Sequence, residues 1–251
     1  MFGIALRFGV PLAALKTANP SVQPNFMGEG TTLLIPLTPT APINPTPTPT
    51  PIPNATPTPA SLQTDCYRDA LGGIYCFVSY ANKSDRPIEN VTAVVSLKGI
   101  TSEYERDQVA ILPLNILPAE TTLPLVTYFQ PPTPQLFSAS ALPDFSLPVP
   151  SGDERYLEAS ITEHSIQLNA GKSSAVVNGV VSLSDPLKPA GSLWVLGVGY
   201  SADGRVIGFR RWEAALPIPL VQQIPFSFNL YSLGPEIDHV DLFVEARPVL
   251  P

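Results

Sequence analysis

Apolar and polar residues alternate along most of the chain after residue 61, with the period of two that half-buried β-strands show. Between Val91 and Leu97 every second residue is apolar. The same alternation returns in Trp194–Tyr200, in Phe226–Leu230 and in Val240–Ala246. Because short strands of this kind follow one another with turn residues between them, the pattern predicts β-sandwich architecture.

Glycine-containing pairs mark the expected turns. Gly72-Gly73 predicts a hairpin between two strands, and Asp203-Gly204 predicts a type I′ hairpin turn. Asn178-Gly179 lies within a run of valines. It is compatible either with a hairpin turn or with a bulge inside one strand.

The alternating stretches form two blocks, residues 61–132 and 153–251, with a Pro-rich connector over 133–152. Each block opens with a strand ending near a glycine, and each places a Leu-Pro pair before its late strands (Leu117-Pro118 and Leu216-Pro217). We therefore predict a mainly β fold class, with two immunoglobulin-like antiparallel β-sandwiches related in tandem.

Residues 1–35 show a helical period instead. Apolar residues three apart predict a short helix ending at Gly9, and Pro11 suits the first turn of a second helix. Asn19-Pro20 stops that helix, and Thr31–Ile35 predicts a short strand. The expected order is helix, helix, strand, a small partial α/β segment.

Residues 36–60 consist almost entirely of Pro and Thr. Ten of these twenty-five residues are proline, which removes ten backbone donors and excludes a helix or a central strand. We expect a disordered, hydrated linker of polyproline II type, spanning about 75 Å at ~3.1 Å per residue.

Three short motifs before this linker are those of one known family: Ile4-Ala5, then Leu15 with Asn19-Pro20, then Gly30–Pro36 with the sequence GTTLLIP. With this spacing, residues 1–36 resemble the latter part of a LysM domain. That resemblance implies a βααβ fold that binds N-acetylglucosamine-containing glycans such as peptidoglycan and chitin. The family's first strand and its GDT turn have no counterpart, because the chain starts at Met1. We expect a truncated LysM-like segment over 1–35.

The missing turn forms half of the LysM glycan groove, so the resemblance carries over only the loop after the second helix. The glycan-binding candidates that it implies are Asn19, Pro20, Ser21, Val22, Gln23 and Gly30.

The first block resembles a second family. The passage from Gly73 to Ser84, GIYCFVSYANKS, followed by IENVTAVVSL from Ile88 to Leu97, is similar to the FxLYD domains of bacterial envelope proteins. This resemblance implies a small immunoglobulin-like sandwich and an exported protein.

Composition narrows the function classes. The formal net charge is −7, which argues against nucleic acid and against an anionic membrane surface. No apolar run is long enough for a membrane span. Arg7 interrupts the apolar start of the chain, so we expect that a signal sequence is missing from this chain.

Cys66 and Cys76 flank the Gly-Gly turn almost symmetrically. Cross-strand neighbours at this distance meet disulfide geometry, and an exported domain with two cysteines favours a disulfide. Two cysteines without a nearby histidine do not predict a metal site.

The sequence contains none of the common catalytic motifs, and we expect no catalytic residues, no metal and no cofactor. Its two histidines, His164 and His239, lie in strand-like stretches. The densest polar and aromatic cluster is Arg210, Arg211 and Trp212. It is a candidate recognition surface, and the alternative is a strand end with Arg packed over the ring.

These observations favour a non-enzymatic, extracellular or cell-envelope protein that binds cell-wall glycan (peptidoglycan or a chitin-like polymer). The Pro/Thr linker would hold the sandwiches away from the wall for a protein partner or another wall polymer. The alternative is an accessory or structural spacer module of a wall-active enzyme or envelope assembly.

Overall fold

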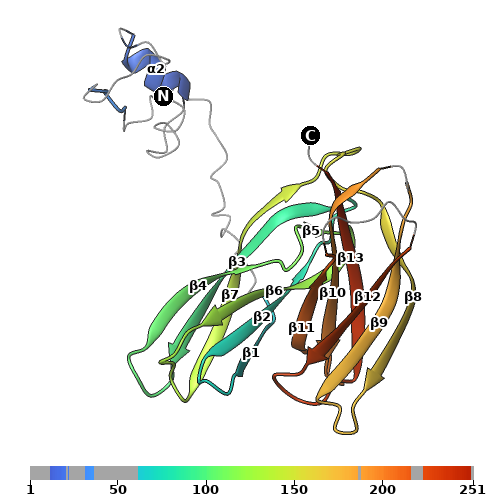
Figure 1. The fold of residues 1–251 in the computed structure, drawn as a ribbon. Coiled ribbons are helices and arrows are strands. Elements are labelled where there is room, and N and C mark those ends of the chain that lie inside the picture. Colours follow the sequence, from blue (N-terminus) through green and yellow to red (C-terminus); the bar gives the residue numbers. More distant parts are fainter. Residues whose placement is uncertain are drawn as a thin grey trace, which may run out of the picture. The chain divides into compact units, whose positions relative to one another are not determined.

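The computed structural model describes residues 12–20, 22, 32–36, 62–185, 188–215 and 223–249 of the 251-residue chain. The chain divides into two compact units, Met1–Ala55 and Thr56–Pro251 (Figure 1). The predicted helix ending at Gly9 and nearly all of the predicted Pro/Thr linker lie outside the described residues.

In the first unit, helix α2 spans Leu12–Ala18 and confirms the second predicted helix. Leu15 on this helix is fully buried. The chain turns after it, with the Val22 N–H donating to the Asn19 carbonyl at 3.2 Å. Residues 32–36 carry no strand assignment, so the described part of the expected strand Thr31–Ile35 lacks the ladder pairing that defines a strand.

The second unit is mainly β, as predicted, and begins with seven strands. They are β1 (Thr64–Arg68), β2 (Ile74–Ala81), β3 (Ile88–Gly99), β4 (Glu105–Ile111), β5 (Ile116–Leu117), β6 (Thr122–Phe129) and β7 (Phe137–Pro148). They form one antiparallel sheet in the order β1-β2-β6-β4-β3, with β5 and β7 also paired to β3.

This first sheet folds back on itself to enclose a core. Strands β4 and β6 pair only at Ile111 and Val126, and an isolated bridge from Leu62 to Ala141 links the start of the sheet to β7. Layer β1-β2-β6 therefore faces layer β4-β3-β7, as in a β-sandwich. Alternate residues of both layers fill the space between them, which explains the period of two in the sequence. We call this part module 1.

Module 2 contains the remaining strands of the described chain. They are β8 (Ala159–Leu168), β9 (Ser174–Leu183), β10 (Ala190–Tyr200), β11 (Val206–Glu213), β12 (Gln223–Tyr231) and β13 (His239–Pro248). They form two three-stranded antiparallel sheets, β11-β10-β13 and β12-β9-β8, which enclose a second core.

The two modules share one topology when the two-residue β5 is set aside. Layer β1-β2-β6 of module 1 corresponds in strand order to β8-β9-β12 of module 2, and β4-β3-β7 corresponds to β11-β10-β13. The first hairpins also match: Asp69 before β2 and Asn169 before β9 each accept backbone N–H groups of their own turn. The opening strands that end near a glycine are present in both modules as β1 and β8. The second shared feature of the sequence blocks cannot be compared, because Leu216-Pro217 lies outside the described residues.

The modules stack as four layers in the order β4-β3-β7, β1-β2-β6, β11-β10-β13 and β12-β9-β8 (Figure 1). Strand β10 is buried on both faces: Leu193 and Val195 pack in the core of module 2, whereas Leu196 and Val198 pack against module 1. The outer face of layer β1-β2-β6 meets them, and Phe77 contacts Phe209 edge-on at 6.1 Å.

Three local expectations need correction or completion. The stretch 133–152, expected as a connector, contains the twelve-residue strand β7, because its prolines occupy a strand that lies beside only one neighbour over most of its length. Asp203-Gly204 does form a hairpin, but only Gly204 has a positive φ (75°), so the turn is not type I′. Asn178-Gly179 lies inside β9, and the register shift falls on its neighbour β8.

Candidate functional site

The candidate glycan loop of the first unit is organised by Asn19. Its side-chain amide donates to the carbonyl of Leu15 at 2.8 Å and to the carbonyl of Leu34 at 2.7 Å. Its side-chain oxygen accepts the Leu34 N–H at 2.7 Å. Asn19 therefore joins the end of α2 to the segment 32–36, and it is buried. In this geometry its side chain holds these two segments together.

Of the other loop candidates, Pro20 is exposed and Val22 is half-buried. Ser21, Gln23 and Gly30 lie outside the described residues. Of the six candidates, the structure therefore describes Asn19, Pro20 and Val22, of which Pro20 is exposed.

The predicted cluster Arg210, Arg211 and Trp212 lies on β11, at the edge of its sheet. Successive side chains point to opposite faces of a strand. The Arg211 guanidinium lies over the Trp194 ring at 4.4 Å and donates to the Pro113 carbonyl at 2.7 Å. Trp212 packs on the other face, against Phe226. The three side chains therefore do not form a single stacking platform.

An open cleft of about 750 Å³ lies between the two modules and is a third candidate site, which includes Arg210 and Arg211. Its lining combines apolar and aromatic side chains, from the exposed Ile111 and Tyr231 to the fully buried Phe77, with charged and amide groups. The lining residues are Tyr75, Phe77, Ile111, Leu112, Pro113, Val126, Gly208, Phe209, Arg210, Arg211, Glu213, Asn229, Tyr231 and Leu233. Aromatic rings stack on sugars or apolar side chains, and guanidinium groups bind carboxylates. Arg211 already donates to Pro113 and to Glu213, so Arg210 is the guanidinium of this lining that a carboxylate-bearing sugar or peptide segment would meet.

A buried carboxylate holds the connection between β4 and β5, whose residues Leu112 and Pro113 line this cleft. Glu245 on β13 accepts the N–H groups of Asn115 (2.6 Å) and Ile116 (3.2 Å), and the Asn115 side-chain amide at 2.8 Å. Arg247 donates to the same carboxylate at 2.9 Å. Glu245 is only 4% exposed. Its bonds to Asn115 and Ile116 therefore cross the boundary between modules in a desolvated setting.

A second group of polar residues holds the segment between modules. Glu89 on β3 accepts bonds from Arg155 and from the Tyr156 hydroxyl, each at 2.9 Å. The Tyr156 hydroxyl in turn accepts from Arg247 at 3.0 Å, which connects this group to Glu245. The bond from Arg155, followed by that from Tyr156, lowers the pKa of Glu89 although partial burial opposes the change. We call Glu89, Asn115, Arg155, Tyr156, Glu245 and Arg247 the interface network.

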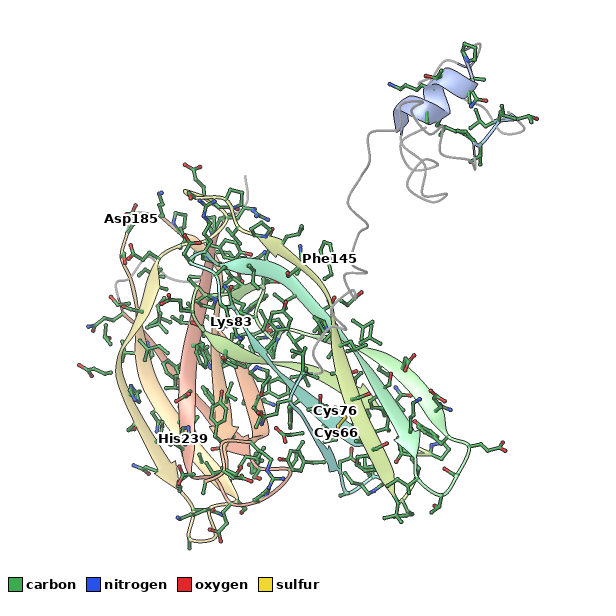
Figure 2. The ribbon with its side chains drawn as sticks, turned by 180° about the vertical axis from the view of Figure 1, so that it is seen from behind. Cys66, Cys76, Lys83, Phe145, Asp185 and His239 are labelled. Carbon is green, nitrogen blue, oxygen red and sulfur yellow. A yellow bond between two sulfur atoms is a disulfide. The ribbon has the colours of Figure 1, made fainter. Side chains whose placement is uncertain are left out.

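The predicted disulfide is formed. Cys66 and Cys76 are direct cross-strand partners with a Cα–Cα distance of 4.1 Å, and their sulfurs are bonded (Figure 2). Cys76 is fully buried in the core of module 1. The bond therefore ties the β1–β2 hairpin to that core.

Of the two histidines, His239 is held by its neighbours, whereas His164 is exposed on β8. His239, labelled in Figure 2, stacks on Tyr200 with ring centroids 5.0 Å apart and bonds Asp238 at 3.0 Å. Within the described ranges, no three His, Cys, Asp or Glu side chains are grouped as a metal site would need. Among the described helices, none is long and apolar enough to cross a membrane.

Comparison of the sequence with models of known protein families gave no match, and a search of curated proteins gave no match either.

Sequence reasoning missed the cleft between modules and the interface network. The alternation on β11 already places Arg211 and Trp212 on opposite faces. The partners of Glu245, however, lie about 130 positions away in the chain. No local pattern predicts such a contact, because it depends on how the modules stack.

Proposed function

We propose that this protein is a non-catalytic component of the cell envelope that binds cell-wall glycan through its first unit and displays the two sandwiches as one body. The glycan class is an N-acetylglucosamine polymer, peptidoglycan or chitin-like. The displayed body presents the cleft between modules to a protein or a second wall polymer.

The observation that carries this proposal is the Asn19 contact with Leu34. Both residues belong to the motifs on which the LysM resemblance depends, and the three bonds of the Asn19 side chain join the end of α2 to the segment 32–36. The disulfide of module 1 supports export, because disulfides persist in oxidising compartments.

The test is retention on insoluble peptidoglycan and on chitin. The whole chain is compared with a chain lacking residues 1–35 and with Asn19→Ala, which removes the bonds to Leu15 and Leu34. We expect the whole chain to be retained on the polymer and the chain lacking residues 1–35 to stay in the supernatant. Asn19→Ala should bind at least tenfold more weakly than the whole chain.

A matched control is Asn178→Ala, which removes an asparagine side chain of β9 in the second unit and leaves the first unit unchanged. It should be retained like the whole chain. If the deletion is retained as well as the whole chain, the sandwiches bind the wall and the assignment of the first unit is wrong.

A further inference from the structure

One side of strand β11 has unpaired backbone groups where it lines the cleft between modules. The Ala214 N–H, just after β11, donates to the Leu193 carbonyl of β10 at 3.0 Å. In an antiparallel pair only alternate residues bond to the neighbouring strand. The backbone groups of Phe209, Arg211 and Glu213 therefore point away from β10, and no described residue bonds to them. They form a strand edge that can accept a further strand.

The corresponding edge of module 1 is closed. Strand β4, which corresponds to β11, pairs with β6 at Ile111 and Val126. In module 2 the chain just after β12 donates a single backbone bond to β11, from the Leu233 N–H to the Ile207 carbonyl at 2.7 Å. No ladder between described residues joins the rest of β11 to β12. The repeated topology thus leaves this edge open in module 2 only where it borders the cleft.

Three other strands at sheet edges contain features that interrupt pairing. Pro225 lies within β12, Pro143 lies within β7, and β8 has a register shift. Proteins use prolines and bulges of this kind to keep edges from pairing with other chains. Residues 208–213 of β11 contain neither a proline nor a register shift. This edge therefore remains competent to pair.

The cleft determines which side chains an added strand would need. Phe209 and Arg211 lie on the face of β11 that meets module 1. On that side the cleft is lined by the half-buried Val126 and the exposed Ile111, which favour apolar side chains. Arg210 lies on the opposite face, is exposed, and bonds to no described carboxylate. An acidic side chain flanked by two apolar ones matches this arrangement, because neighbours in a strand alternate between faces.

We propose that β11 binds an extended peptide of a partner protein as an additional antiparallel strand in the cleft between modules. The unpaired backbone groups of β11 bond to the main chain of the peptide. Alternate apolar side chains cover Ile111 and Val126, and an acidic side chain between them pairs with Arg210. This inference rests on the part of the proposed function that assigns the cleft to a protein partner, and it does not depend on glycan binding by the first unit.

Other occupants fit this edge less well. Two copies of β11 paired antiparallel over residues 208–213 would bring Arg210 and Arg211 of both copies together, and like charges opposite one another are unfavourable. A sugar chain lacks the regularly spaced N–H and C=O groups that pair with a strand edge. The parallel arrangement of a peptide is slightly less stable per residue than the antiparallel one.

Fluorescence anisotropy with labelled, end-capped peptides of about nine residues tests the proposal on the whole chain. The first peptide alternates threonine and valine and has aspartate at its centre, between two valines. Two further peptides carry leucine or phenylalanine in place of valine. Because so short a segment buries less area than a standard interface, we expect at least one of the three to bind with a dissociation constant on the order of 100 µM.

Methylation of the peptide backbone tests strand pairing in the unmodified protein. In the antiparallel arrangement the amides of the apolar residues donate to β11, whereas those of the threonines point away from it. N-methylation at the apolar positions should weaken binding at least tenfold, and N-methylation at the threonines should have little effect. Amide hydrogen exchange at Phe209, Arg211 and Glu213 should slow when the peptide is bound.

Charge reversal tests the role of Arg210. Arg210→Glu should bind the aspartate peptide at least tenfold more weakly and should prefer a version with central lysine. Arg86→Glu is the matched control, because Arg86 is equally exposed but lies in the loop between β2 and β3, away from the cleft. It should bind the aspartate peptide like the unmodified chain.

Failure of all three peptides to bind would overturn the proposal, and so would equal binding of the two N-methylated forms. Slowed exchange on β12 in place of β11 would also overturn it. Retention on peptidoglycan and chitin is measured on the same preparations, and Arg210→Glu should be retained like the whole chain. Loss of one activity without the other therefore shows which of the two assignments has failed.

Discussion

Glu245 is the residue that links the two modules most tightly. Its carboxylate is almost fully buried and receives bonds from Asn115, Ile116 and Arg247. Removing one partner of a buried, hydrogen-bonded charge pair leaves the others desolvated and unpaired. Most of the loss in the free energy of unfolding then comes from the unpaired groups that remain buried, and less of it from the lost bond itself.

We predict that Glu245→Ala lowers the free energy of unfolding by about 3 kcal/mol. Urea denaturation followed by tryptophan fluorescence and circular dichroism measures this change. Glu213→Ala is a suitable control, since its carboxylate is half-exposed and pairs only with Arg211. It should cost less than about 1 kcal/mol. Equal losses in the two variants would mean that Glu245 has no special role at the boundary.

Glu89 should make the stability of the second unit depend on acid pH. Arg155 and Tyr156 hold its pKa below the ordinary value of 4.5 in the folded state. The folded protein therefore binds this proton less readily than the unfolded chain does. The stabilisation is fully present above the unfolded pKa and is lost as the pH falls through the lowered folded pKa.

Thermal unfolding measured from pH 6 down to pH 3 tests this expectation. The melting temperature of the unmodified protein should fall more steeply below pH 4.5 than that of Glu89→Gln, which cannot titrate. Asp153 and Asp69 also have lowered pKa values, so the variant should keep part of the slope. Identical slopes for the two proteins would rule out a contribution from Glu89.

At the scale of elements, glycine in β10 sets how closely the two sheets of module 2 approach. A Cβ added at Gly197 would lie 2.8 Å from the Phe228 ring, and one at Gly199 would lie 2.9 Å from Leu230. Neither glycine has a positive φ, so the constraint comes from packing and not from backbone conformation.

Gly197→Ala should therefore destabilise the protein by about 1–3 kcal/mol through overpacking, although alanine is otherwise acceptable in a strand. Chemical denaturation measures the loss. Gly171→Ala is the control, because a Cβ there meets nothing within 4 Å and its φ is not positive. A neutral Gly197→Ala would show that the sheets have room to separate.

The sequence was sufficient for elements with strong alternation, such as β3, β10, β12 and β13, and for the disulfide between neighbouring strands. It was not sufficient for β7, where proline argues against a strand although the chain lies beside β3. It was also not sufficient for the positioning role of Asn19, which depends on a contact with Leu34 fifteen residues later. In both cases the deciding partner is distant in sequence.

The candidate sites show the same limit. Arg210, Arg211 and Trp212 stand out as a cluster in the sequence, but the strand separates their side chains. The cleft between modules combines residues from β2, β4, β6, β11 and β12, which no single stretch reveals. Stacking of repeated modules creates this surface, so its prediction requires the topology first.

At the scale of the whole molecule, the proposed function depends on the two modules behaving as one body. The modules share an apolar boundary through β10 and a polar boundary through the interface network. Tyr156 lies in the segment that joins β7 to β8 and contributes to that network. This segment is therefore part of the boundary between modules and not a free hinge.

Differential scanning calorimetry of the whole chain with its disulfide intact tests this most directly. We expect one transition for the two modules, with equal calorimetric and van't Hoff enthalpies of about 130 kcal/mol. Glu245→Ala should shift that single transition to lower temperature. Two resolved transitions of about 60 kcal/mol each, with Glu245→Ala moving only one of them, would contradict the single body.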